Sequence, residues 1–175
     1  MLGEIFLLLF LFLIIGSIGF YTLKLGVPPM PTLSSTRLLM MELLPQNIDG
    51  AIYDLGSGWG SLVLSLAGRY PKNHVTGFEL SPVPWLASKL RGAFSQQSSV
   101  MLRREDFFQA DLSDAGLIVC YLHPEAMTKL KTKLEAELKP GTLVLCHYFS
   151  VPGWQPLKNI TVKDAHRSPI YLYKI

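Results

Sequence analysis

Hydrophobic residues follow three different patterns along this chain of 175 residues. From Ile5 to Leu23 every residue is apolar, small or an uncharged polar residue. At about 1.5 Å per residue, a helix over this segment matches the roughly 30 Å hydrocarbon thickness of a bilayer. After residue 50, short apolar runs alternate with segments of helical periodicity. Beyond Phe149 this alternation breaks into turn residues, which predicts a different arrangement at the C-terminal end.

The alternating part predicts strands and helices in turn. The expected strands are 51–55, 74–80, 99–103, 117–122 and 142–149, and the expected helices are 34–44, 61–69, 83–94 and 124–138. The continuous apolar run Leu117–Leu122 is typical of a strand covered on both faces, as in a parallel sheet. Two further short strands, Asn159–Ala165 and Ile170–Ile175, surround a turn and predict a hairpin. We therefore expect an α/β fold in which five parallel strands are followed by an antiparallel hairpin, behind one N-terminal transmembrane helix.

The chain divides into three expected parts: a transmembrane anchor at 1–25, a proline-rich linker at 26–31 and one domain at 32–175. A cleaved signal peptide is the alternative for the first part. Against it, no basic residue precedes the apolar stretch, the stretch is too long, and no small-x-small cleavage site follows. The linker contains Pro28, Pro29 and Pro31 and holds the domain within roughly 20 Å of the bilayer even when extended.

The charge distribution predicts the orientation of the anchor. The N-terminal side carries only the terminal amine and Glu4, whereas Lys24 and Arg37 follow the apolar stretch. The positive-inside rule then leaves the domain in the cytoplasm as part of a single-pass membrane protein. All 16 Lys and Arg lie from Lys24 onward, but they are scattered. This mildly basic surface suits a loose attraction to the lipid bilayer and gives no reason to expect a nucleic-acid partner.

The two cysteines, Cys120 and Cys146, each lie inside an apolar strand-like run. Buried thiols in a cytoplasmic domain are expected to be small hydrophobes without a disulfide. A zinc site would need His123 and His147 as further ligands. Because Cys146 and His147 are adjacent on one strand, their side chains point to opposite faces, and we expect no metal.

A glycine-rich turn follows the first predicted strand, in the segment from Asp54 to Gly60. Gly56, Gly58 and Gly60 allow a tight turn and a close approach of a ligand to the backbone. The carboxylate of Asp54 would repel phosphates and would suit a cationic ligand. S-adenosylmethionine (SAM), with its ammonium and sulfonium groups, fits this requirement.

Two more acidic residues accompany the next strands, one at the end of the second strand and one after the third. Glu79 follows the last glycine by the interval expected of a ribose-binding acid, and Asp106 is placed to meet the adenine amino group. As alternatives, Asp54 could cap a helix and Asp106 could be an ordinary surface residue. An NAD enzyme would normally have an apolar residue in place of Asp54, and the chain has no P-loop lysine. The set therefore favours a SAM site.

These motifs resemble the class I SAM-dependent methyltransferases, which have a Rossmann-like sheet. A narrower resemblance connects most of the domain with the small membrane-anchored protein-lysine methyltransferases, whose best-known members modify mitochondrial proteins, including an ATP synthase subunit. It is carried by the segments Pro29-Met30-Pro31-Thr32, Tyr53 to Gly58, Glu79 to Pro82 with Trp85-Leu86, and Phe149 with Pro152-Gly153-Trp154. The chain departs from that family at Trp59 and Ser61, where Asp and Arg are usual, and at an apparent insertion, Val83-Pro84.

The resemblance also implies where the methyl acceptor binds. The segment from Tyr121 to Pro124 stands where many amino-methylating relatives have an Asn/Asp-Pro-Pro-aromatic loop. It implies catalytic roles for Tyr121, which would orient the amine, and His123, which would accept a proton, with Pro124 binding the substrate. Trp154 is expected to wall the acceptor channel. The alternatives are that Tyr121 only packs at a strand end, His123 is a loop residue, and Trp154 covers the sheet edge.

The combined expectation is a membrane-anchored SAM-dependent methyltransferase that modifies lysine in a membrane-associated protein. A methyltransferase of a small molecule or lipid headgroup is the nearest alternative. A methyltransferase-like scaffold without activity is the third, because the amino-methylating motif is missing.

Overall fold

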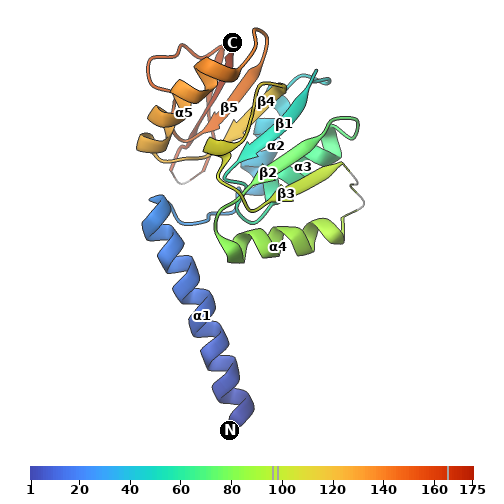
Figure 1. Ribbon diagram of the computed structural model, residues 1–175. Coiled ribbons are helices and arrows are strands. Elements are labelled where there is room, and N and C mark those ends of the chain that lie inside the picture. Colours follow the sequence, from blue (N-terminus) through green and yellow to red (C-terminus); the bar gives the residue numbers. More distant parts are fainter. Residues whose placement is uncertain (96, 98, 165) are drawn as a thin grey trace.

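The computed structural model describes residues 1–95, 97, 99–164 and 166–175. A long helix, α1 (Leu2–Leu25), projects away from a compact α/β domain that contains the rest of the chain (Figure 1). None of its residues is buried. It ends at Gly26, which has the left-handed conformation that commonly closes a helix, with φ of 75°. By its length and composition, the helix is long and apolar enough to cross a bilayer.

The domain is built on one sheet of seven strands in the order β3-β2-β1-β4-β5-β7-β6. Its strands are β1 (Ala51–Leu55), β2 (Val75–Phe78), β3 (Val100–Arg103), β4 (Ala115–Cys120), β5 (Leu143–His147), β6 (Lys158–Thr161) and β7 (Pro169–Lys174). The first five pair in parallel, whereas β7 is antiparallel to both β5 and β6. The predicted Rossmann-like sheet with an antiparallel C-terminal hairpin is confirmed.

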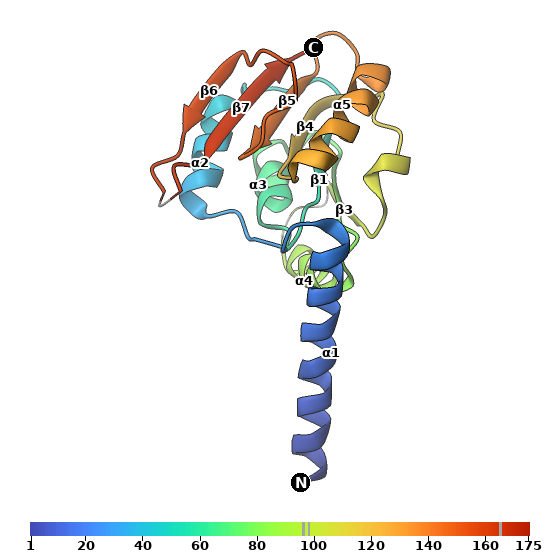
Figure 2. The ribbon, with the colours of Figure 1, turned by 90° about the vertical axis from the view of Figure 1, so that its left-hand side faces the viewer.

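Helices cover both faces of the sheet. On one face, α2 (Ser34–Leu43) and α3 (Ser61–Arg69) share a core with inward residues such as Leu117 and Val119. On the other, α5 (Pro124–Glu137) packs against Ile118 and Cys120. Alternate residues of β4 therefore enter different cores, which is why its sequence is continuously apolar. Figure 2 shows α2 and α3 beyond the sheet and α5 on the opposite side.

Some element boundaries differ from the predictions. The strand expected at 117–122 occupies Ala115–Cys120, so Tyr121 and Leu122 lie in the turn that follows it. A 3₁₀ turn, η1 (Phe107–Gln109), was not expected. The strand predicted over Asn159–Ala165 is β6, which ends at Thr161, and the predicted end at Ala165 lies outside the described residues. Cys120 and Cys146 are both free and buried, as expected.

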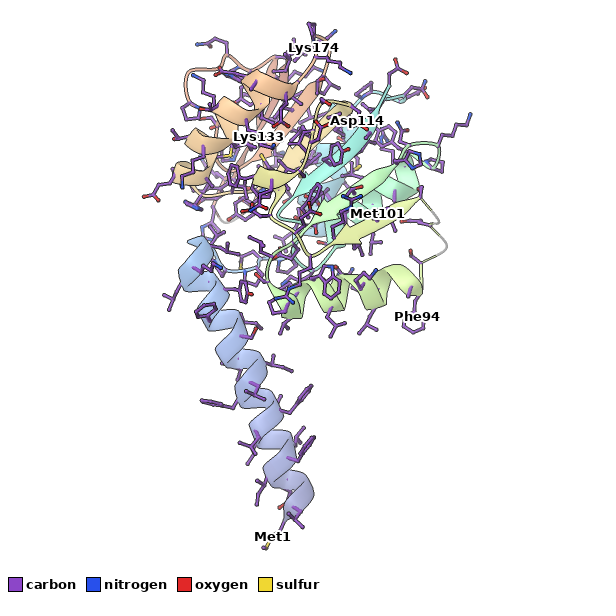
Figure 3. The ribbon with its side chains drawn as sticks, in the orientation of Figure 1. Met1, Phe94, Met101, Asp114, Lys133 and Lys174 are labelled. Atoms are coloured by element: carbon purple, nitrogen blue, oxygen red, sulfur yellow. The ribbon has the colours of Figure 1, made fainter. Side chains whose placement is uncertain are left out.

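Helix α1 and the carboxyl ends of the parallel strands lie at the same end of the molecule. In Figure 3, Asp114 and Lys174, which are near the opposite ends of those strands, point away from Met1. The linker that leaves α1 crosses the carboxyl ends before it reaches α2. α4 (Pro82–Ala93) lies at this same end, beside α1 and across its direction (Figures 1 and 2). Ligands of open α/β sheets bind at the carboxyl ends of the strands, so this is where the site is expected.

Candidate functional site

A cavity of about 530 Å³ opens at the carboxyl ends of the parallel strands. This volume is in the range of pockets that hold small molecules and cofactors. Four of the residues predicted to bind a cofactor line this cavity together: Gly56, Gly58, Glu79 and Asp106. Of the other two, Asp54 lines a small neighbouring cavity together with Gly56, and Gly60 lines neither cavity.

The carboxylate of Glu79 joins the first two strand-to-helix turns. Its two oxygens accept hydrogen bonds from the backbone N–H of Gly58 at 2.9 Å and of Ser81 at 2.7 Å. Gly58 has φ of 53°, a conformation that favours glycine. The side chain of Glu79 is only 7% exposed. Glu79 is therefore fixed in the cavity wall before any ligand arrives.

Gly60 has a packing role. It caps α3 with φ of 80°, and a Cβ atom added there would lie 2.7 Å from the Cβ of Ser88 in α4. Only glycine allows this close contact between α4 and the start of α3. Gly60 is not among the residues that line the cavity, so the structure gives it a place behind the site.

Asp54 is a buried carboxylate that lacks a complete set of partners. Its side chain is 4% exposed, and its Oδ2 atom has no hydrogen-bond partner among the described residues. Burial, together with the nearby charge of Glu79, raises its pKa from 3.8 to about 7, and the backbone N–H of Val63 opposes this shift. A cationic group placed beside Oδ2 would supply the missing partner and favour the charged form. This is the property expected of a residue that binds the ammonium of SAM.

The far end of the cavity is aromatic. Asp106 accepts a hydrogen bond from the backbone N–H of Phe108 at 3.0 Å and so caps η1. Phe107 and Phe108 also line the cavity, with ring centroids 4.4 Å apart. Sequence reasoning identified the acid but missed the two rings. Two adjacent phenylalanines directly after a predicted adenine-binding acid were a signal that could have been used.

The proline-rich linker forms one wall of the cavity. Pro28, Pro29 and Met30 line it, as do Lys24 and Leu25 at the end of α1. Trp59, in the glycine turn, donates a hydrogen bond from Nε1 to the carbonyl oxygen of Pro29 at 2.6 Å. From sequence, the linker was expected to be only a spacer, and the presence of Trp59 in place of the usual Asp had no explanation. The structure explains Trp59, because its indole holds the linker against the glycine turn.

Tyr121 stands between two cavities. It lines the large cavity and also a small cavity of about 20 Å³, which Asp54 and His147 line as well. Its ring is 5.1 Å from that of His147 and 6.1 Å from that of Tyr148. Burial is the main cause that raises the pKa of Tyr121, and the neighbouring Tyr148 raises it further. The phenol therefore stays neutral at physiological pH.

His123 lines the large cavity together with Lys24 and Leu25 at the end of α1. A Cβ added to Gly26 would lie 3.3 Å from its ring. Pro124 opens α5 beside it, is exposed, and is not among the cavity-lining residues. Tyr121 and His123 are therefore brought to the cofactor residues, whereas Pro124 stands at the rim.

Trp154 is placed elsewhere. Its Nε1 donates a hydrogen bond to Glu135 of α5 at 2.9 Å, and its ring meets Tyr173 at 5.6 Å in an edge-on contact. Neither cavity at the strand ends includes it. A role in acceptor binding stays a prediction.

His147 was given no role from sequence, yet it reaches the small cavity. Its Nε2 lies 3.0 Å from the Oγ of Ser168. Burial lowers its pKa, and Asp164 opposes this shift. Within the described part of the chain, no group of three or more His, Cys, Asp or Glu is placed to hold a metal ion.

Comparisons with known proteins agree with this geometry. Residues 54–158 match the family model for the ANTKMT methyltransferase domain. The chain is 32% identical to a protein-lysine N-methyltransferase from Saccharolobus islandicus, over 85% of this chain and 94% of that protein. It is 34% identical to the adenine nucleotide translocase lysine N-methyltransferase of Mus musculus, over 62% of this chain and 47% of the mouse protein. Among solved structures, an RNA methyltransferase from Salinibacter ruber in complex with S-adenosyl-L-homocysteine is similar, with a TM-score of 0.72 and 29% identity over 83% of this chain and 94% of that one.

Proposed function

The chain belongs to the ANTKMT methyltransferase domain family of SAM-dependent protein-lysine methyltransferases, and on this premise we propose that it methylates lysine in a protein at the membrane surface. The single observation that supports this location best is that Lys24 and Leu25, the last residues of the apolar helix, line the cofactor cavity. A lysine that reaches the cavity beside them must belong to a protein close to the end of α1.

We assign the SAM-binding roles as follows. Asp54 receives the ammonium of the methionyl group through its unpaired Oδ2. Glu79, already fixed by Gly58 and Ser81, accepts hydrogen bonds from the ribose hydroxyls. Asp106 receives the adenine amino group beside Phe107 and Phe108. The volume of the cavity, the unpartnered carboxylate oxygen of Asp54 and the rings of Phe107 and Phe108 support the assignment of this cofactor.

When bound, SAM supplies an electrophilic methyl group for an in-line displacement by an amine. The protein has to present the lysine unprotonated and about 3 Å from that methyl. In this proposal the neutral phenol of Tyr121 would accept a hydrogen bond from the amine and so orient its lone pair. His123, on the same cavity, would take a proton from the incoming ammonium. Pro124 at the rim would guide the substrate chain.

The parts of the chain follow from the same proposal. Residues 1–25 form a single-pass anchor, 26–31 a linker and 32–175 the catalytic domain, which faces the cytoplasm where SAM is made. The 24-residue α1 is about 36 Å long at 1.5 Å per residue, enough to span a bilayer. Relatives named for the adenine nucleotide translocase and for ATP synthase support a membrane protein as the acceptor.

Transfer of tritium from labelled SAM tests the proposal. The full chain would be incubated with membranes, which are then separated into protein, lipid and RNA fractions. We expect label in protein, recovered as methyllysine after hydrolysis, and none with Glu79→Gln, which keeps the size of the side chain. Label in lipid would favour the headgroup alternative. SAM binding without any transfer would favour a scaffold.

A further inference from the structure

Helix α4 has its small residues inside and its large apolar residues outside. The inner face carries the small residues Pro84, Ser88 and Gly92, and a Cβ added to Gly92 would lie 3.2 Å from Leu102. Trp85, beside them, is half-buried and donates a hydrogen bond from Nε1 to the carbonyl oxygen of Leu102 at 3.2 Å. The outer face carries Leu86, Leu90 and Phe94, which are 54%, 56% and 88% exposed. These three residues follow one another at intervals of four, so they form a single stripe. A surface helix of a soluble protein normally shows the reverse arrangement.

The stripe faces the side of the domain from which α1 projects. α4 lies across the direction of α1, beside its C-terminal part (Figures 1 and 2). Phe94, at the end of α4, points toward the side where Met1 lies (Figure 3). Arg104 ties the two parts together by donating a hydrogen bond to the hydroxyl of Tyr21 in α1 at 3.3 Å and by bonding the carbonyl of Leu80 just before α4. If α1 crosses a bilayer, the outer face of α4 meets the surface of that bilayer.

The charges on α4 fit a lipid surface. The helix contains Lys89 and Arg91, both exposed, and no acidic residue. Lys89 lies beside the stripe, with its Nζ 5.9 Å from the centre of the Trp85 ring. Arg91 turns back to the domain, where its Nη1 donates a hydrogen bond to the carbonyl oxygen of Trp59 at 2.9 Å. Basic residues beside an exposed apolar stripe are typical of helices that lie in the interface of an anionic membrane.

We propose that α4 is an interfacial helix whose Leu86, Leu90 and Phe94 enter the boundary between headgroups and acyl chains of an anionic bilayer. The proposal rests on the anchoring of α1 proposed above and adds a second attachment. A single spanning helix can still rotate and tilt in the bilayer and carry the attached domain with it. Two attachments fix the domain, so that the cavity beside Lys24 keeps one orientation at the surface.

Depth measurements with nitroxide labels test this on the full chain. Both native cysteines are buried, so a label attaches at one introduced site. Phe94→Cys and Leu90→Cys report on α4, and Leu157→Cys is the matched control, a leucine that is 61% exposed beside the amino ends of the parallel strands. Phe10→Cys reports on α1 independently. The proteins are reconstituted in vesicles of phosphatidylcholine and phosphatidylglycerol, and collisions with oxygen and with a nickel chelate give the depth.

We expect labels at 90 and 94 to lie about 5–10 Å into the interface, with an oxygen-to-nickel accessibility ratio several-fold above that at 157. A label at 94 that behaves like the one at 157, while the label at 10 is deep in the bilayer, would overturn the inference and leave the anchor standing. If the label at 10 is also in water, the anchor itself fails. Protection at 94 that disappears as the protein is diluted with lipid would mean that a second protein molecule covers the stripe, which also overturns the proposal.

Discussion

Replacing Asp54 with Asn should stabilise the unliganded protein while damaging its cofactor site. The side chain is 4% exposed, and its pKa is raised from 3.8 to about 7 by burial and by Glu79. The unfolded chain releases this proton near pH 4, whereas the folded protein holds it until about pH 7. Raising the pH through this interval therefore favours the unfolded state, and the wild type loses stability until the folded carboxyl has also ionised.

The size of the effect follows from the two pKa values. At about 1.4 kcal/mol for each pH unit, the interval between 3.8 and about 7 lowers the free energy of unfolding by about 4 kcal/mol above pH 7. At pH 5 the free energy of unfolding is lowered by only about 2 kcal/mol. Asn has a similar shape and no charge to bury. The stability difference between Asp54→Asn and wild type should therefore grow by about 3 kcal/mol from pH 5 to pH 8.

Urea unfolding without SAM, followed by tryptophan fluorescence of the full chain in lipid nanodiscs, measures this difference. Asp49→Asn is the matched control, because Asp49 is an exposed carboxylate at the opposite end of the strands and its substitution removes no buried charge. A constant difference between Asp54→Asn and wild type across this pH range would refute the reasoning. It would mean that the Asp54 carboxyl ionises as easily in the folded protein as in the unfolded one.

Three further outcomes follow from the site. Since SAM is expected to bind the ionised form of Asp54, its affinity should rise about tenfold per pH unit up to about pH 7 and then level off, and calorimetry should show no such dependence in Asp54→Asn. Trp59→Phe keeps a ring but removes the hydrogen bond to Pro29, and a loss of about 1 kcal/mol should weaken SAM binding roughly fivefold; unchanged affinity would mean that the linker is not a functional wall. Tyr121→Phe should lower kcat at least about tenfold with an unchanged KM for SAM in steady-state kinetics, whereas an equal loss in SAM affinity would place the phenol in cofactor binding.

The cofactor side of the site could be predicted because its signals are local. Gly56 and Gly58 lie in one turn. Glu79 follows β2 directly and Asp106 comes three residues after β3, and the parallel pairing of these strands brings their carboxyl ends together. The alternation of strands and helices was sufficient for the fold. Strand ends were less accurate, as at Tyr121, because an apolar run does not indicate where pairing stops.

The linker wall and the outward face of α4 could not be predicted in the same way. The contact of Trp59 with Pro29 joins residues 30 positions apart, and no pattern in either segment indicates it. The orientation of α4 depends on whether Ser88 or Leu90 faces the domain. This is decided by the close approach to Gly60, a tertiary contact, and the apolar periodicity alone would favour burial of the leucines.

The wall made by Pro28, Pro29 and Met30 affects how the enzyme can be prepared or degraded. A soluble form trimmed to the start of α2 would keep every glycine and acid of the site but would lose one side of the cavity. This form would then bind SAM more weakly than the intact protein does. Proteolysis within the linker would likewise both release the domain from α1 and open its cofactor cavity. Detachment and inactivation would be a single event.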